Sequence, residues 1–320
     1  MLRVVGPGPV APVSPAPPGA TASPAGPRTT APPTVRTQVR LPLHPPFDVA
    51  GLLGALAAHA LPGAERHDAG AATHARTVPA SHGPATVTVR LTGSHVDAVV
   101  EAAVSDVPAV VALVRRWLDL DAEPADVVKV LGRDPLLAPL VAERPGLRVL
   151  GHVDGFEAAV VTVLGQQVSL AAARTFGARL VTAYGSTAPG GLRAFPRPAG
   201  LAAVDPAELR AAVRVTGARA RTVHALATAC ADGLDITPGN DPALVRRRLL
   251  ELPGIGPWTA DYLALRALGD RDACPAGDLV LRRALGGLDA RAAAARAEPW
   301  RPLRAYAVTH LWTSAAYART

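Results

Sequence analysis

Two features toward the C-terminal end of the chain contain residues that could do chemistry, namely a glycine-rich turn and an isolated acid. The turn is the Pro-Gly-Ile-Gly of LPGIGPWTADYLALRALG, residues 252–269, between two segments with helical apolar spacing. The backbone N–H groups of Gly254, Gly256 and Trp258 would be unpaired donors where a helix begins and its dipole favours an anion. Both glycines allow positive φ and the close approach of a partner. The pattern predicts either a phosphate-binding hairpin or an ordinary helical hairpin with a glycine cap.

The isolated acid is Asp278, which lies downstream of the turn in an apolar and basic neighbourhood. Its position in Gly-Asp before Leu-Val-Leu-Arg-Arg suits a helix N-cap, because the carboxylate can accept a hydrogen bond from a free N–H of the first turn. A capped carboxylate would also be held firmly enough for chemistry. Two other acids nearby, Asp270 and Asp272, are interpreted as loop residues.

The elements that position these residues fall into three parts. Residues 1–37 are rich in Pro, Ala, Gly and Thr without apolar periodicity, so we predict a disordered tail. Residues 38–105 combine alternating apolar segments with a helical pattern at 47–61, which predicts a small antiparallel sheet carrying a helix. Residues 106–320 are helical in pattern, including one long apolar segment that ends at Gly185. The predicted fold class is α+β, a sheet domain followed by an all-helical body.

The composition narrows the class of protein. A net charge of +7 and a pI of about 10.3 favour a polyanionic partner such as nucleic acid, although an arginine bias from GC-rich coding would have the same effect. The two cysteines, Cys230 and Cys274, fit neither a disulfide framework nor a zinc or iron–sulfur site. No apolar run is long enough for a membrane helix, and prolines interrupt the N-terminus too early for a signal sequence. We therefore expect a cytoplasmic protein with no membrane partner and no required cofactor.

Several separated blocks resemble the AlkA-type DNA-3-methyladenine glycosylase II family of the helix-hairpin-helix DNA glycosylase superfamily. They are PPFD at 45–48, GLRVLGHVDGFEAAVVTVLGQQVS at 146–169, LPGIGPWTADYLALRALG at 252–269 and EPWRPLRAYAVTHLW at 298–312. Their order and spacing match over residues 38–320. The resemblance implies a monofunctional DNA N-glycosylase of base-excision repair. It would flip alkylated purines, of the 3-methyladenine and 7-methylguanine class, out of double-stranded DNA and hydrolyse the glycosidic bond to leave an abasic site.

The resemblance also implies roles for individual residues. Asp278 matches the catalytic aspartate, whose carboxylate would stabilise the positive charge that develops on the sugar. Aromatic positions that line the base pocket match Trp258, Tyr262 and Trp312, and core packing is the alternative for each. Gln167 matches the residue that fills the gap left by the flipped base, called here the wedge; a helix-capping or core-bonded amide is the alternative. The remaining two large aromatics of the C-terminal block, Trp300 and Tyr306, are assigned to the core.

The hairpin is expected to hold a monovalent cation, Na⁺ or K⁺, through backbone carbonyls. By the resemblance, these carbonyls belong to Leu250, Leu252 and Ile255. Arginines at 246–248 and 282–283 are candidate phosphate contacts, and solvated surface charge explains them equally well.

This sequence departs from the family pattern at two aromatic positions, and at a third position it differs from strand-cutting relatives. Leu279 and Ala55 stand where aromatic residues occur in the family, which predicts a more open pocket. Trp258 stands where strand-cutting relatives carry a nucleophilic lysine, and Lys129, the only lysine, is far away in the sequence. The sequence therefore predicts no lyase activity.

Other interpretations stay open. The chain could remove a different lesion such as a deaminated base, or be a non-catalytic helix-hairpin-helix DNA-binding module. It could also be the glycosylase half of a fused adaptive-response protein whose other half carries a methyl-acceptor domain. We expect a monomer associated with the bacterial nucleoid.

Overall fold

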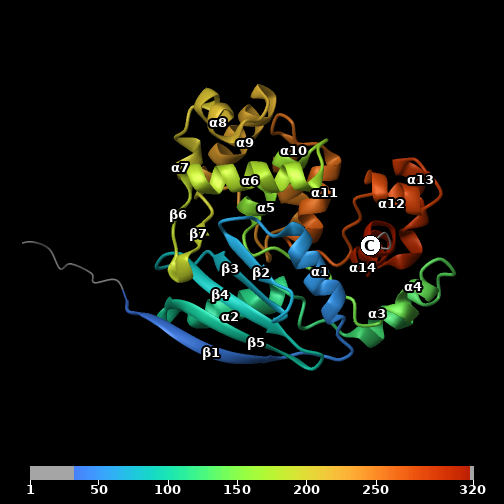
Figure 1. Ribbon diagram of the computed structural model, residues 1–320. Coiled ribbons are helices and arrows are strands. Elements are labelled where there is room, and N and C mark those ends of the chain that lie inside the picture. The colour runs from blue at the N-terminus through green and yellow to red at the C-terminus, as the bar shows by residue number, and fades with distance from the viewer. Residues whose placement is uncertain (1–31, 318–320) are drawn as a thin grey trace, which may run out of the picture. The chain divides into compact units, whose positions relative to one another are not determined.

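The computed structural model describes residues 32–317. An antiparallel sheet is followed by helices that continue to the end of the described chain, which confirms the predicted α+β fold class (Figure 1). The five strands are ordered β1-β5-β4-β3-β2. The bounds of this part are β1 Thr34–Pro42, α1 Val49–His59, β2 Glu65–Asp68, β3 Thr73–Val78, β4 Ala85–Leu91 and β5 His95–Ala103. The disorder predicted for residues 1–31 lies outside the described part.

The start of β1 corrects the predicted extent of the disordered tail. Residues 34–37 were included in that tail, yet they form the first part of β1 and pair with β5 from Ala103 to Val100. This segment has little apolar surface to bury, because β1 is an edge strand with alternating exposed positions. Backbone hydrogen bonds to β5 order it, and composition carries no signal for such pairing.

One face of the sheet is packed against α2, Val107–Trp117, which contacts β5. The same hydrophobic cluster holds Val87 and Val100 of the sheet, Val114 and Trp117 of α2, and extends to Val153. The domain boundary predicted at residue 105 falls inside this cluster. Whether residues 38–105 form a domain of their own stays a prediction.

The second cluster forms the core of the helical body. The helices after α2 are α3 Pro124–Leu131, α4 Ala138–Glu143, α5 Gly155–Gly165, α6 Leu170–Tyr184, α7 Pro198–Ala202, α8 Pro206–Val213, α9 Gly217–Ala231, α10 Pro242–Leu250, α11 Pro257–Arg266, α12 Leu279–Ala284, α13 Ala290–Arg296 and α14 Arg304–Tyr317. A short ribbon of β6, Ser186–Thr187, and β7, Arg193–Ala194, interrupts them. None of the helices within residues 32–317 is both long and apolar enough to cross a membrane.

The long apolar segment predicted to end at Gly185 is two helices, α5 and α6. Gln166 ends α5 with an extended ψ of 127°, and Gln167 in the connecting turn then has a left-handed φ of 56°. The side chain of Ser169 then caps α6 by accepting a hydrogen bond from the Ala172 N–H at 3.2 Å. The break sets the predicted wedge residue on an exposed turn.

A buried ionic cluster joins the sheet to the helical body. Arg76 of β3 donates to the carboxylate of Glu157 on α5 at 2.7 Å, and its other guanidinium nitrogen lies 3.5 Å from the Glu65 carboxylate. The Trp117 ring lies under the guanidinium at 5.5 Å. Burial raises the pKa of Glu157 to about 7, although Arg76 opposes the rise. This cluster fixes α5 against the sheet.

Candidate active site

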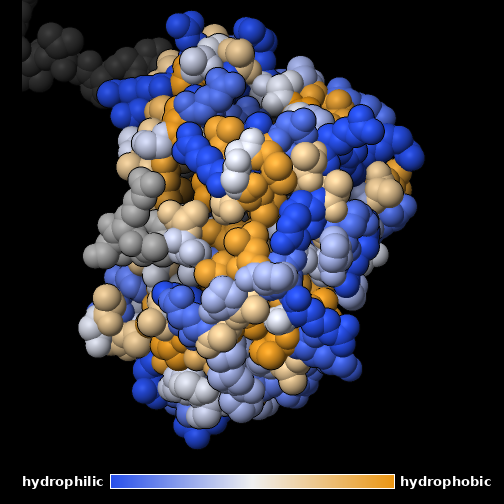
Figure 2. Space-filling model, turned by 90° about the vertical axis from the view of Figure 1, so that its right-hand side faces the viewer, coloured by the Kyte–Doolittle hydropathy of each residue, from blue (hydrophilic) through white to orange (hydrophobic). Residues whose placement is uncertain are grey.

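A cavity of about 590 Å³ lies where α1, which follows the first strand of the sheet, faces the helical body. Its walls come from α1, residues 147–152, α5, α6, α11, α12 and α14. The surface of one face of the molecule is hollowed, with apolar residues gathered in the hollow and hydrophilic residues around it (Figure 2). A cavity of this size accommodates a flat ring system the size of a nucleobase.

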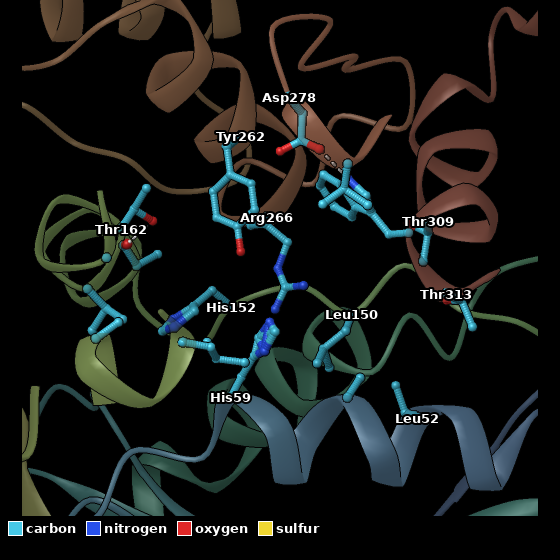
Figure 3. Close-up of a pocket in the computed structure, with 18 of the residues that line it drawn as sticks. Leu52, His59, Leu150, His152, Thr162, Tyr262, Arg266, Asp278, Thr309 and Thr313 are labelled. Atoms are coloured by element: carbon cyan, nitrogen blue, oxygen red, sulfur yellow. Dashed lines mark hydrogen bonds between the residues drawn. The ribbon is translucent and has the colours of Figure 1, made fainter. Parts of the chain in front are cut away.

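Asp278 lines the cavity and is the N-cap of α12 at the same time. Its Oδ1 accepts hydrogen bonds from the Leu281 N–H at 2.9 Å and from the Trp312 indole N–H at 2.9 Å. Its Oδ2 accepts a hydrogen bond from the Trp258 indole N–H at 3.0 Å. The two interpretations of this acid are therefore compatible. Three donors from three elements hold the carboxylate in one orientation toward the cavity (Figure 3).

The three predicted pocket aromatics lie together beside this carboxylate. The Trp258 and Tyr262 rings stack with their centroids 5.4 Å apart. The Tyr262 and Trp312 rings are tilted, with centroids 5.9 Å apart. All three are only partly buried and line the cavity, so they are not plain core residues. In contrast, Trp300 and Tyr306 are each 1% exposed, as predicted for core residues.

Opposite Asp278, the pocket is closed by three residues that the sequence did not single out, His59, His152 and Arg266 (Figure 3). Burial and the Arg266 charge lower the pKa of His59 to about 4, so its imidazole is neutral. Burial and the Arg76 charge hold the pKa of His152 well below its usual range. Arg266 follows Tyr262 by one helical turn and its guanidinium lies 5.9 Å from that ring, so helical spacing could have found it. The histidines carry no comparable signal in the sequence.

The two missing aromatics have different consequences. Ala55 of α1 lines the cavity, so the position where the family has an aromatic residue does belong to the pocket wall; that this makes the pocket more open stays a prediction. Leu279 is 62% exposed and is not part of the cavity wall, which is formed by the next residue, Val280. The expectation that Leu279 opens the pocket is wrong, because an N-cap at 278 directs the first helical residue outward.

Of the two glycines in the hairpin between α10 and α11, one adopts a positive φ and the other leaves open space beside the backbone. Gly254 has a φ of 82°, and a Cβ there would lie 2.3 Å from the Thr222 hydroxyl of α9. Gly256 has a φ of −104°, so it does not use the freedom to adopt a positive φ. A Cβ at Gly256 would meet no atom within 4 Å, and this side of the turn is open. The N–H groups of Gly254, Gly256 and Trp258 donate no hydrogen bond to any acceptor within residues 32–317.

The turn that contains Gln167 is hydrogen-bonded to this hairpin through the preceding residue, Gln166. The Gln166 side-chain amide donates to the Gly254 carbonyl at 3.1 Å and to the Thr259 hydroxyl at 3.2 Å. Gln167 is exposed, and its side chain has no hydrogen bond to any other described residue. The core-bonded amide considered for Gln167 is therefore Gln166.

The candidate phosphate-binding arginines divide into two groups. Arg246 pairs with Asp261 at 2.7 Å, and Arg248 and Arg282 donate to backbone carbonyls. The exposed Arg247 and Arg283 have no ion pair or side-chain hydrogen bond within the described part of the chain. Only these two are free for an external anion.

The carbonyls expected to hold a cation are compatible with that role. Within residues 32–317, the Leu250 and Ile255 carbonyls accept no hydrogen bond, and the Leu252 carbonyl accepts one, from the Ile255 N–H at 3.2 Å. Each therefore has a free lone pair, and such oxygens suit a hard cation.

Comparison with known proteins agrees with this geometry. Residues 38–154 match the AlkA N-terminal domain, and residues 160–299 match the HhH-GPD superfamily of base excision DNA repair proteins. The DNA-3-methyladenine glycosylase 2 of Escherichia coli is 34% identical over 84% of this chain and 94% of its own length. A probable bifunctional transcriptional activator/DNA repair enzyme AlkA of Mycobacterium tuberculosis is 43% identical over 86% of this chain, which spans 56% of that relative.

Among solved structures, the 3-methyladenine DNA-glycosylase from Archaeoglobus fulgidus has the same fold. Its TM-score is 0.78 at 19% identity, covering 88% of this chain and 99% of that one. The sequence matches and the fold together show that the chain belongs to the AlkA-type DNA-3-methyladenine glycosylase family.

Proposed function

We propose that the chain is a monofunctional DNA glycosylase that removes alkylated purines from double-stranded DNA and leaves an abasic site. The observation that carries this proposal is the Asp278 carboxylate, held by the indoles of Trp258 and Trp312 at the wall of an aromatic pocket. A non-catalytic DNA-binding module would need neither the pocket nor an oriented acid inside it.

The carboxylate performs the chemical step by electrostatics. A flipped purine in the pocket places its sugar beside Asp278, because that residue lies at the wall opposite the His59 and Arg266 side. As the glycosidic bond breaks, the deoxyribose becomes positively charged, and a preorganised carboxylate stabilises that charge. Water then adds to the anomeric carbon. An alkylated purine is cationic and leaves readily, and the stacked Trp258 and Tyr262 rings favour a cationic base.

The exposed turns hold the DNA. The free N–H groups of Gly254, Gly256 and Trp258 bind a backbone phosphate, and a Na⁺ or K⁺ ion on the hairpin carbonyls would add a positive charge there. Gln167 fills the space left by the flipped base, since its turn is exposed and fastened to the hairpin through Gln166. We propose that one monomer acts on DNA in the cytoplasm, at the nucleoid.

The absence of a strand-cutting step follows from the position of Trp258. Its indole donates to Asp278 where a lyase would need an amine, and Lys129 lies on the exposed side of α3 outside the cavity. Incubation with dimethyl-sulfate-treated duplex should release free methylated purines while the strand stays whole until alkali is added. Borohydride should trap no covalent complex. Release of no methylated base would refute the glycosylase proposal, and a trapped complex would refute the monofunctional one.

A further inference from the structure

The pocket side opposite Asp278 contains polar groups that lack protein partners. Within the described part of the chain, the Arg266 guanidinium has no carboxylate and no hydrogen-bond acceptor, although Arg266 is partly buried and its Nε is fully enclosed. The His59 side chain also has no hydrogen bond there. Buried polar groups in proteins are almost always paired. The enclosed nitrogens, His59 Nδ1 and Arg266 Nε, are out of reach of a ligand in the cavity. Both side chains line the cavity, however, and within the described residues their other nitrogens have no protein partner, so a ligand there can accept hydrogen bonds from them.

Both groups act as donors toward the cavity. A guanidinium has five N–H donors and no acceptor. The Nδ1 of His59 is enclosed without a partner, and an enclosed lone pair costs less than an enclosed N–H, so the proton belongs on Nε2. The neutral imidazole then presents Nε2–H to the pocket. The floor formed by His59 and Arg266 is called the donor floor below.

The position of the sugar beside Asp278, at the other end of the pocket, determines which edge of a purine meets the donor floor. When the sugar lies beside Asp278, the edge of the base farthest from the sugar faces His59 and Arg266. In a 6-oxopurine such as guanine, that edge carries the O6 acceptor, whereas a 6-aminopurine such as adenine carries an N–H₂ donor there. If a 6-aminopurine enters the pocket, its N–H₂ group faces the donors of His59 and Arg266. These donors then stay unpaired, which strongly disfavours binding of that base.

We propose that the donor floor makes the enzyme selective for damaged 6-oxopurines over damaged 6-aminopurines. This inference rests on the proposed glycosylase function and specifies its substrate class. Both 7-methylguanine and 3-methyladenine are cationic in DNA, so the Arg266 charge repels both alike. The O6 acceptor separates them, because only 7-methylguanine offers the donor floor a carbonyl.

The test is base release from methylated duplex DNA, with each enzymatic rate divided by the spontaneous release rate of the same base. For the wild type, the acceleration should be larger for 7-methylguanine than for 3-methyladenine. Arg266→Met keeps the length of the side chain and removes its donors. It should lower the ratio of the 7-methylguanine acceleration to the 3-methyladenine acceleration about tenfold, the effect of one charge-assisted hydrogen bond, because relief of the charge repulsion affects both bases alike and cancels in the ratio. His59→Phe should act in the same direction.

Two controls separate selectivity from damage to the fold. Arg291→Met, on the exposed side of α13, should leave both rates unchanged. Binding to a duplex with a tetrahydrofuran abasic site, which has no base, should be the same for wild type and Arg266→Met. Equal losses for both bases, or a loss confined to 3-methyladenine, would overturn the selectivity inference alone. Release of neither base by the wild type would overturn the proposed function and this inference with it.

Discussion

Asp278→Asn is expected to slow the release of 7-methylguanine from duplex DNA about a thousandfold, while the fold and DNA affinity are retained. The asparagine keeps the shape of the side chain and a carbonyl oxygen that can cap α12, since Asn and Asp are equally good N-caps. Its NH₂ group cannot accept the hydrogen bond that the Trp258 indole donates to Oδ2 of Asp278, so one indole loses its partner as well. The substitution removes the negative charge that faces the sugar, and loss of a preorganised charge-stabilising group costs about two to three orders of magnitude in rate. The rate is measured under single-turnover conditions, with the melting temperature checked beside it.

The matched control for this change is Asp289→Asn. Asp289 caps α13 as Asp278 caps α12, by accepting a hydrogen bond from the Ala292 N–H at 2.8 Å, but it lies outside the cavity. The control should excise at the wild-type rate. If both variants lose activity equally, the effect belongs to helix capping and not to the charge in the pocket.

Arg76→Met is expected to lower the free energy of unfolding by about 3–5 kcal/mol, because it leaves buried carboxylates without their cation. Glu157 and Glu65 both lie against Arg76, and all three side chains are buried. The double variant Arg76→Met/Glu157→Met should recover much of the loss, since a matched apolar pair replaces the ion pair. Urea unfolding of the wild type and the single and double variants measures both effects.

The pH dependence of this loss provides its sharpest check. Burial already raises the pKa of Glu157 from its ordinary 4.5 to about 7 in the folded protein, and without Arg76 it should rise further. A raised carboxyl pKa means that the folded state holds its proton more tightly, so stability falls as pH rises above 4.5 through the folded pKa. The Arg76→Met deficit should therefore be larger at pH 8 than at pH 5. A deficit independent of pH would show that lost packing, and not an unpaired Glu157, destabilises the variant.

Local chemistry made part of the site predictable. The turn around Gly254 and the helix cap at Asp278 are each specified by a few consecutive residues. Trp258 and Tyr262 share a helix face because they are one turn apart. The break between α5 and α6 gives no signal in the sequence, since apolar residues continue on both sides of it and only the backbone angles of Gln166 and Gln167 interrupt the helix.

The rest of the site depends on tertiary structure. His59 ends α1 and lines the same cavity as Arg266 of α11 only because α1 and the helical body pack together. Within the described residues, the side chains of His59 and Arg266 have no hydrogen-bond partner because they face the cavity. The apolar periodicity of the sequence cannot predict this. The Arg76–Glu157 pair likewise joins residues far apart in the chain. The strand pairing of residues 34–37 was missed because the partner strand β5, and not local composition, orders it.

The central claim is that the Asp278 carboxylate stabilises positive charge at the anomeric position of a flipped nucleotide. Its most direct test compares the affinity for two duplexes, one with a neutral tetrahydrofuran abasic site and one with a pyrrolidine whose protonated nitrogen replaces the anomeric carbon. The pyrrolidine duplex mimics the positive charge of the transition state. It should bind the wild type at least a hundredfold (about 3 kcal/mol) more tightly than the neutral tetrahydrofuran duplex. Asp278→Asn should bind the two duplexes with nearly equal affinity. Equal binding by the wild type, or an unchanged preference in Asp278→Asn, would contradict the claim.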